Sequence, residues 1–210
     1  MQLYDTTGRR KYLTPTERHE FFCAAEKASR EVQTFCSTLG YTGCRISEAL
    51  ALTGTQIDLA AGVLVFESLK KRRKGIYRGV PVPRSFLELL DAVHNLAALG
   101  DQRLWKWSRT TAWRRVREVM DAANIRGAWA TPKGMRHGFG VRAVTASIPL
   151  NLTQRWLGHA NIGTTAIYAN AIGPEEQQIA ARKWGPPPGG GSPQVCVMCG
   201  SSLVLPESNV

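Results

Sequence analysis

The stretch GVLVFESLKKRRKGIYRGVPVP, residues 62–83, decides the fold class of this chain. Its first part, residues 62–66, is a short apolar run rich in valine, which is typical of a strand. Residues 78–83 predict a partner strand near a sheet edge, because proline cannot donate a hydrogen bond to a ladder. The basic run at residues 70–75 lies between them. We therefore expect a β-hairpin with this run at its tip.

Helical patterns lie on both sides of the hairpin. Thr14-Pro15-Thr16-Glu17 has the form of a capping box with proline at the first helical position, so a helix should begin there. Further helices are expected over residues 32–39, 46–52, 85–96, 110–123, 150–157 and 164–169, and after Thr131-Pro132. The sequence predicts an α+β fold that is predominantly helical, with a small antiparallel β-sheet inserted among the helices.

The chain carries a large positive charge. Its 27 Lys and Arg against 16 Asp and Glu give a formal net charge of +11 and a pI near 9.9. Such a surplus suits a polyanion, because each phosphate contact releases condensed counterions; a basic soluble surface or an anionic membrane face are the alternatives. The sequence has neither a long apolar stretch nor a long basic amphipathic helix, so we expect no membrane partner. Residues 1–10 lack a secretory signal pattern, which favours the cytoplasm.

The length of 210 residues suits one substantial core. We expect a catalytic domain over residues 1–184 and a Pro/Gly-rich linker over residues 185–194. The tail, residues 195–210, contains Cys196 and Cys199, which are half of a zinc-knuckle pattern. Because the tail offers no further ligands, we expect disorder and no metal there, unless a second chain completes the site.

A group of polar residues suggests phosphate chemistry. Cutting a DNA phosphodiester without a metal needs a nucleophile, cations for the non-bridging oxygens and an acid for the leaving oxygen. Taken singly, the candidates have ordinary explanations: a solvated arginine at a helix start, a structural histidine, a tyrosine at the edge of the core. In chain order the candidates are Arg45, Lys133, Arg136, His159 and Tyr168.

Together these residues resemble the tyrosine recombinase family, which includes phage integrases, Xer-type resolvases and fimbrial-switch recombinases. GCRISEAL, residues 43–50, is similar to the first arginine box of the family, and RHGF, residues 136–139, to the second. LGHA at 157–160 followed by TTAIY at 164–168 is similar to the nucleophile box. The resemblance runs from about Tyr12 to Ala171, which is most of the chain.

The resemblance implies a role for each residue. Arg45 and Arg136 would hold the non-bridging oxygens of the scissile phosphate, a task that suits the fork of a guanidinium. His159 would donate a hydrogen bond to the same phosphate. Tyr168 would form a 3′-phosphotyrosyl bond and release a 5′-hydroxyl, so religation would need neither ATP, metal nor cofactor. Glu48 would orient Arg45 or cap nearby amides.

Two lysines would handle protons. The general acid of the family is a lysine on the β-hairpin, for which Lys70 fits best and Lys71 or Lys74 are the alternatives. A solvated basic loop that touches only the DNA backbone is the other interpretation. Lys133 stands where the family usually has histidine, and lysine is a poor general base because it stays protonated near neutral pH. His137 should point about 100° away from its neighbour on the helix, into the core.

The implied function is site-specific recombination, namely integration, excision or inversion of double-stranded DNA. We expect a homo-oligomer, a tetramer on paired recombination sites, with an accessory DNA-bending or partner protein as a further partner. The first arginine box lies at residue 45, close to the start of the sequence. In this respect the chain resembles short family members that lack a core-binding domain. The alternatives are a DNA-binding regulator that has lost cleavage and a type IB topoisomerase-like enzyme.

Overall fold

The computed structural model of the chain describes residues 2–68, 75–170, 180–181 and 183. Strands β2 (Val63–Glu67) and β3 (Tyr77–Pro81) pair antiparallel, with Leu64 opposite Val80. A two-residue strand, β1 (Ile57–Asp58), pairs with the other side of β2, so the order is β1-β2-β3. The hairpin prediction is confirmed; β1 is an addition that is too short to show an alternating pattern.

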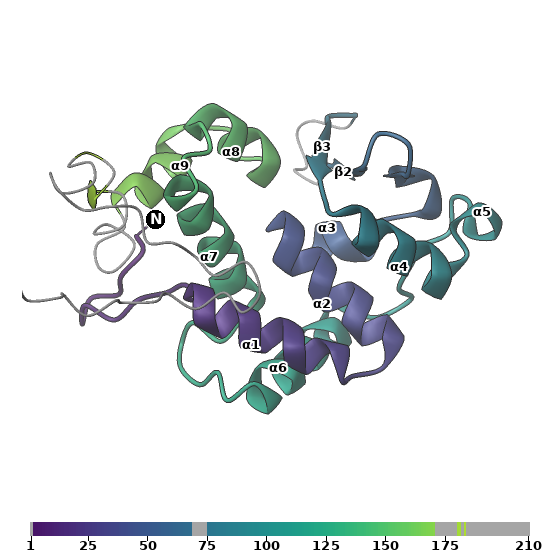
Figure 1. Ribbon diagram of the computed structural model, residues 1–210, viewed down its shortest axis with the longest axis horizontal. Coiled ribbons are helices and arrows are strands. Elements are labelled where there is room, and N and C mark those ends of the chain that lie inside the picture. The colour runs from purple at the N-terminus through teal and green to yellow at the C-terminus, as the bar shows by residue number, and fades with distance from the viewer. Residues whose placement is uncertain (1, 69–74, 171–179, 182, 184–210) are drawn as a thin grey trace, which may run out of the picture.

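Helices make up most of the described residues, and the prediction of a predominantly helical α+β fold is confirmed (Figure 1). They are α1 (Pro15–Glu26), α2 (Arg30–Thr42), α3 (Ile46–Ala51), α4 (Arg84–His94), α5 (Leu96–Leu99), α6 (Arg109–Ala122), α7 (Pro132–Thr145), α8 (Leu150–Leu157) and α9 (Gly163–Ala166), with 3₁₀ turns η1 (Gly54–Gln56) and η2 (Ile167–Asn170).

Helix α1 begins at the predicted capping box. The Thr14 hydroxyl accepts a hydrogen bond from the Glu17 amide at 3.2 Å, and the Glu17 carboxylate accepts one from the Thr14 amide at 2.9 Å. The same carboxylate also receives Arg10 in a bidentate pair at 2.6 Å and the indole N–H of Trp129 at 3.0 Å. One helix cap therefore ties the N-terminal segment to the loop before α7.

Helix α2 is longer than predicted. We expected it to end at Gly40, but it continues to Thr42 and ends at Gly43, whose φ of 60° lies in the left-handed region that favours glycine. Gly40 lies within the helix, and the ring of Phe22 packs so closely against it that an added Cβ would stand 2.6 Å from Phe22 Cζ. Glycine is therefore needed there for packing and does not end the helix. The correct end matters for function, because the chain turns at Gly43 directly before Arg45.

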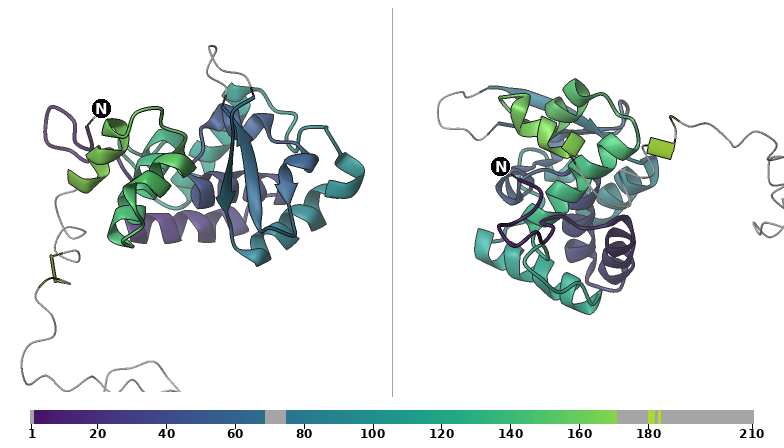
Figure 2. Two further views of the ribbon diagram at one scale, coloured as in Figure 1. Left: turned by 90° about the horizontal axis from the view of Figure 1, so that it is seen from above. Right: turned by 90° about the vertical axis from the view of Figure 1, so that its left-hand side faces the viewer.

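The described residues form two hydrophobic clusters of unequal size. The larger one surrounds α2 and joins α1, α3, α4, α6 and the sheet, with Phe35, Leu64 and Trp105 among its fully buried members. The smaller one consists of Leu3, Tyr12, Val141, Leu157 and Tyr168. Both views of Figure 2 place the start of the chain beside the segment of α9 and η2, in keeping with this second cluster.

Some predictions fall outside the described residues. These include the tip of the hairpin with Lys70, Lys71 and Lys74, and the linker and the tail with Cys196 and Cys199. The division into domains accordingly stays a prediction. Among the helices of the described part of the chain, none has the length and apolar character needed to cross a membrane.

Candidate active site

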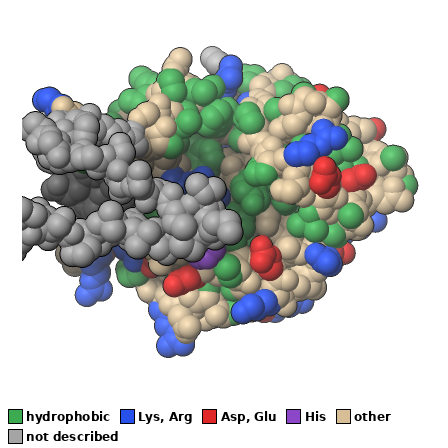
Figure 3. Space-filling model, viewed as in Figure 1, with side chains coloured by type: hydrophobic (Ala, Val, Ile, Leu, Met, Phe, Trp, Pro, Cys, Tyr) green, Lys and Arg blue, Asp and Glu red, His purple; other side chains and the backbone are tan. Residues whose placement is uncertain are grey.

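A cleft of about 580 Å³ opens where α3, α6 and α7 begin. Its cationic lining comes from Arg45 before α3, Arg109 at the start of α6, and Lys133 and Arg136 in the first turns of α7. His159 also lines it, from the segment between α8 and α9. None of the described residues that line the cleft is acidic. On the face seen in Figure 3, by contrast, acidic and basic side chains lie interspersed.

Arg45 reaches the cleft because it is the N-cap residue of α3. Its backbone is extended, with φ −77° and ψ 149°, so the side chain leaves the helix at its first turn. Glu48 accepts hydrogen bonds from the Arg45 amide at 2.8 Å and from the Arg45 guanidinium at 2.7 Å. Glu48 therefore both caps the helix and orients Arg45, the two roles between which the sequence left a choice.

Sequence reasoning missed a second partner of Glu48. Arg78 of β3 is buried, and its Nη2 donates to the Glu48 carboxylate at 2.7 Å while its Nε donates to the Trp156 carbonyl at 2.8 Å. Burial raises the pKa of Glu48, but the charges and hydrogen bonds of Arg78 and Arg45 outweigh it and lower the pKa overall. The signal was present in the sequence, since Arg78 alternates with Val80 on the core-facing side of its strand.

Arg136 is also buried and joins the ends of two helices. Its Nη1 donates to the carbonyl of Gly43, the C-cap of α2, at 2.7 Å, and its Nη2 donates to the carbonyl of Leu157, the last residue of α8, at 2.6 Å. Helix C-termini carry partial negative charge and stabilise a cation. Burial and the neighbouring Arg45 lower the pKa of Arg136 to about 10, which leaves it charged at neutral pH.

Tyr168 lies next to the cleft but not in its lining. Its side chain, on η2, is fully buried, and its ring stacks on the His159 ring at a centroid distance of 6.3 Å and an angle of 17°. His159 is held in turn by its Nδ1, which is 2.9 Å from Thr165 Oγ1. Burial raises the pKa of Tyr168, while the charges of Arg136 and Arg45 act to lower it.

His137 lies in the core, as its helical position predicted, and its neighbour there is the candidate nucleophile. The Nδ1 of His137 is 3.3 Å from the Tyr168 hydroxyl. Burial, together with the charges of Lys133 and Arg136, lowers the pKa of His137 to about 4. The pairing joins α7 to η2 across 31 positions of the sequence, so helical periodicity gave no signal for it.

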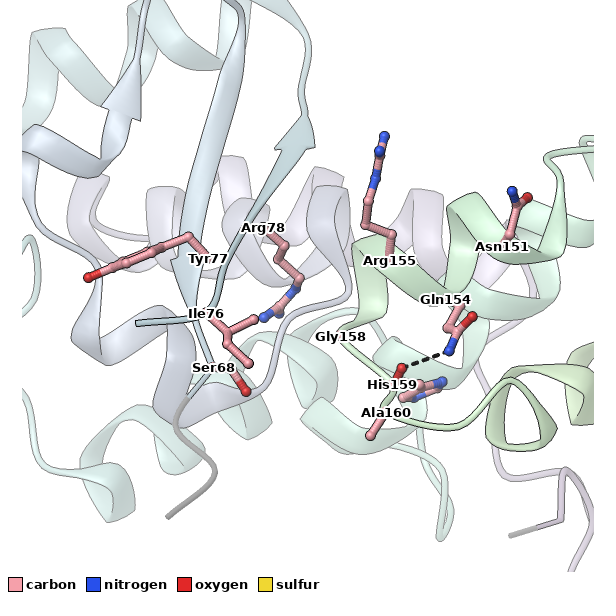
Figure 4. A pocket seen from close by; sticks show the side chains of 10 residues that line it. All are labelled: Ser68, Ile76, Tyr77, Arg78, Asn151, Gln154, Arg155, Gly158, His159 and Ala160. Atoms are coloured by element: carbon pink, nitrogen blue, oxygen red, sulfur yellow. Dashed lines mark hydrogen bonds between the residues drawn. The ribbon is translucent and has the colours of Figure 1, made fainter. Parts of the chain in front are cut away.

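A second hollow, of about 670 Å³, shares His159 with the cleft and lies between β3 and α8 (Figure 4). Ser68 and Ile76, which lie on either side of residues 69–74, both line it. Figure 4 shows Gln154 of α8 donating to the His159 carbonyl, at 3.0 Å. Ser68 and Ile76 thus line the same hollow as His159.

Two further residues of the cleft were not singled out from the sequence. Arg109 and Trp113 of α6 both line it, and the Trp113 side chain is 47% exposed. The signal lies in the helical pattern, because Ala112 and Val116 mark the buried face of α6 while Arg109 and Trp113, four residues apart, share another face. The structure therefore gathers Arg45, Lys133, Arg136 and His159 into one cleft, and adds these two.

Comparison with known proteins agrees with this arrangement. The sequence pattern described as the phage integrase family matches residues 11–172. Tyrosine recombinase XerD of Mycobacterium tuberculosis is 32% identical over 140 residues, 60% of this chain and 43% of that protein. Tyrosine recombinase XerC of Pseudomonas putida is 32% identical over 149 residues, 68% of this chain and 48% of that protein. The chain thus matches less than half of the length of either relative.

Solved structures share the fold. A crystal structure of XerA recombinase aligns with a TM-score of 0.72 at 23% identity, over 82% of this chain and 64% of that one. XerH site-specific recombinase bound to its difH substrate, in a pre-cleavage complex, aligns with a TM-score of 0.68 at 20% identity, over 86% of this chain and 59% of that one. Because the family pattern covers most of the sequence, this chain belongs to the phage integrase family of tyrosine recombinases.

Proposed function

We propose that this chain catalyses site-specific recombination of double-stranded DNA through a phosphotyrosyl intermediate. The observation that carries the proposal is the cleft, which three arginines, a lysine and a histidine line without any acidic residue among the described lining residues. The ring of Tyr168 stacks on that histidine. Such a site attracts a phosphate and stabilises the negative charge that grows on its oxygens in the transition state. DNA as substrate also agrees with the net charge of +11.

In the proposed reaction, Arg45 and Arg136 hold the non-bridging oxygens of the scissile phosphate. Each is fixed beforehand by short hydrogen bonds, Arg45 by Glu48 and Arg136 by two helix-end carbonyls, so little reorganisation is needed when the phosphate arrives. His159 donates a hydrogen bond to the same phosphate. The exposed Lys133 supplies a further positive charge beside it.

The covalent step is a transesterification. The hydroxyl oxygen of Tyr168 gives its proton to water and bonds to phosphorus, and the bond from phosphorus to the 5′ oxygen breaks. That oxygen takes a proton from Lys70, with Lys71 and Lys74 as alternative donors. Ser68 and Ile76 support this assignment, because both line the hollow that contains His159. Attack by a 5′-hydroxyl on the phosphotyrosyl bond reverses the step and joins the strands.

Assembly and compartment are part of the proposal. XerH is bound to its DNA substrate in its crystal structure, and we propose that this chain likewise binds paired DNA sites as a homotetramer, with an accessory DNA-bending or partner protein. The cytoplasm is the compartment that we propose, since the substrate is DNA.

The test is a selection for covalent adducts. The protein is incubated with a pool of DNA duplexes whose central sequence is randomised. Each duplex carries a nick, so that the short fragment with the 5′-hydroxyl diffuses away after cleavage. The reaction is stopped with SDS. We expect an SDS-resistant adduct whose sequencing reveals the preferred site, and none with Tyr168→Phe. Retention of the adduct in Tyr168→Phe, or its absence in the wild type, contradicts the proposal.

Two controls separate the alternative functions. A regulator without cleavage activity would bind DNA in a mobility-shift assay but form no adduct. A topoisomerase-like enzyme would relax supercoiled plasmids that lack the selected site as fast as plasmids that carry it. The proposed recombinase acts preferentially on the selected site.

A further inference from the structure

Tyr168 is in a position from which it cannot react. Its side chain has no exposed surface. A nucleophile must come within about 3–3.5 Å of the atom that it attacks, and a fully buried hydroxyl cannot make that contact with a phosphate in the cleft. Tyr168 therefore has to leave this position before it attacks.

One hydrogen bond holds the hydroxyl where it is. His137 Nδ1 lies 3.3 Å from the Tyr168 hydroxyl, and the two rings are inclined at 58° with centroids 5.9 Å apart. His137 is itself buried, and its second nitrogen, Nε2, has no hydrogen-bond partner among the described residues. Separation of the pair would leave a buried imidazole without a partner, which is costly, so the contact resists the release of Tyr168.

A glycine of α7 makes room for the tyrosine ring. A Cβ added at Gly140 would stand 2.4 Å from Cε2 and Cζ of Tyr168, closer than any real contact. Gly140 lies inside α7, where glycine is less favourable than alanine. The ring and the hydroxyl are thus held by two residues of one helix, three positions apart and on one face.

We propose that His137 is a positioning residue for the nucleophile: it holds Tyr168 in a buried resting position against Gly140, and release from His137 precedes attack on DNA. The attack itself rests on the proposed function. The resting position is a property of the protein without DNA, so it can be tested separately.

The first test measures access to Tyr168 without DNA. Tetranitromethane nitrates tyrosines that solvent reaches, and mass spectrometry of the peptides reports each of the five tyrosines. Tyr77, which is 57% exposed, serves as the internal reference. We expect His137→Phe to raise the nitration rate of Tyr168 relative to Tyr77 by about fivefold, the scale of one net hydrogen bond. Gly140→Ala should raise it as well, because its methyl group takes the space of the ring.

The second test measures the rate of adduct formation at saturating DNA in a single turnover, on a nicked duplex selected as above. Release of Tyr168 should become easier in His137→Phe and Gly140→Ala, so we expect both to form the adduct up to about fivefold faster than the wild type with unchanged DNA affinity. A purely structural role for His137 predicts a slower reaction in proportion to lost folded protein, and a general-base role predicts a slower reaction with intact folding.

The matched control is His94→Phe. His94 of α4 is a half-buried histidine that, like the buried His137, has a hydrogen bond, at 3.0 Å to Thr34, and an edge contact to an aromatic ring, here Trp105. Trp105 belongs to the larger cluster, away from Tyr168. His94→Phe should change neither rate. The proposal is overturned if neither His137→Phe nor Gly140→Ala raises the nitration rate of Tyr168. It is also overturned if neither variant forms the adduct faster than the wild type. Faster nitration in a protein that forms no adduct at all would instead overturn the proposed function and leave the resting position standing.

Discussion

The cations of the cleft and the tyrosine beside it are held in different ways. Arg45, Glu48, Arg78 and Arg136 form short contacts of 2.6–2.8 Å that connect α2, α3, β3, α7 and α8. Tyr168 lies on a four-residue 3₁₀ turn, in a cluster of five buried residues, with one hydrogen bond of 3.3 Å. The charges are therefore preorganised, whereas the proposed nucleophile lies on a part of the fold that has fewer contacts to break.

This difference fits the order of events in the proposed reaction. Charge stabilisation works best when the donors do not have to move. A nucleophile that is always exposed would be able to cut DNA wherever a phosphate enters the cleft. Segments that move in function are drawn from the less stable parts of a fold, and the proposed release of Tyr168 would disturb a cluster of only five buried residues.

The largest effect is expected on the side of the cations. Arg136→Lys keeps the charge but removes the fork that bonds to both Gly43 and Leu157. We expect the rate of adduct formation to fall by about 10²–10³-fold, the scale of one lost transition-state donor. Single-turnover kinetics on the selected duplex measure it. Arg115→Lys, an exposed arginine paired with Glu118 on α6, is the control, and an equal loss there would show that the effect is unrelated to the cleft.

The next prediction concerns the carboxylate of Glu48, which joins Arg45 and Arg78. Glu48→Gln leaves Arg78, with 7% of its side chain exposed, without its charge partner. An uncompensated buried charge costs on the order of 3 kcal/mol of unfolding free energy, to be measured by urea denaturation. Glu118→Gln removes exposed pairs with Arg114 and Arg115 and should change stability by less than about 1 kcal/mol. Equal losses in both variants would contradict the difference between buried and exposed pairs.

A pH dependence is expected on the side of the tyrosine. The pKa of His137 is lowered from 6.5 to about 4 by burial, Lys133, Arg136 and Lys11. The unfolded chain therefore binds a proton on His137 at a higher pH than the folded chain does. The part of the unfolding free energy that depends on His137 is fully present above pH 6.5 and is lost as the pH falls from 6.5 to 4. The loss amounts to about 3 kcal/mol.

His137→Phe removes this titration and should flatten the stability curve over that range. Unfolding by urea at several pH values measures it, and His94→Phe is the comparison, because burial lowers the pKa of His94 as well. If the curve keeps its wild-type slope in His137→Phe, the histidine does not titrate as described.

The two regions also differ in how far the sequence predicted them. The α1 capping box and the bounds of α8 follow from local caps and periodicity, and so does the placement of Arg45, Lys133 and Arg136 at helix starts. Those signals act within a few residues. The hairpin followed from two valine-rich runs around a basic tip.

The contacts that position the residues of the candidate site connect segments that are distant in the sequence. These contacts were less clearly indicated by the sequence than the local helix caps were. Arg78 reaches Glu48 across 30 positions, and its only trace in the sequence is an arginine on the core-facing side of a strand. The contact of His137 with Tyr168 depends on how η2 packs on α7, which neither segment specifies alone. The end of α2 was misplaced because Gly40 serves packing against Phe22 rather than termination.

The smallest effect is expected at the entrance of the cleft. Arg109 lines it at the start of α6, whereas Arg115, on the same helix, is paired with Glu118 at 3.0 Å. If Arg109 contacts a DNA phosphate, Arg109→Gln should reduce the slope of log affinity against log salt by about one, uniformly across DNA sequences. Arg115→Gln should leave the slope unchanged. Fluorescence anisotropy with Tyr168→Phe as the background measures binding without cleavage. Equal slopes for the two variants would show that Arg109 does not contact DNA. The DNA contact would then be left to the cations that Glu48 and the helix ends hold in place, Arg45 and Arg136.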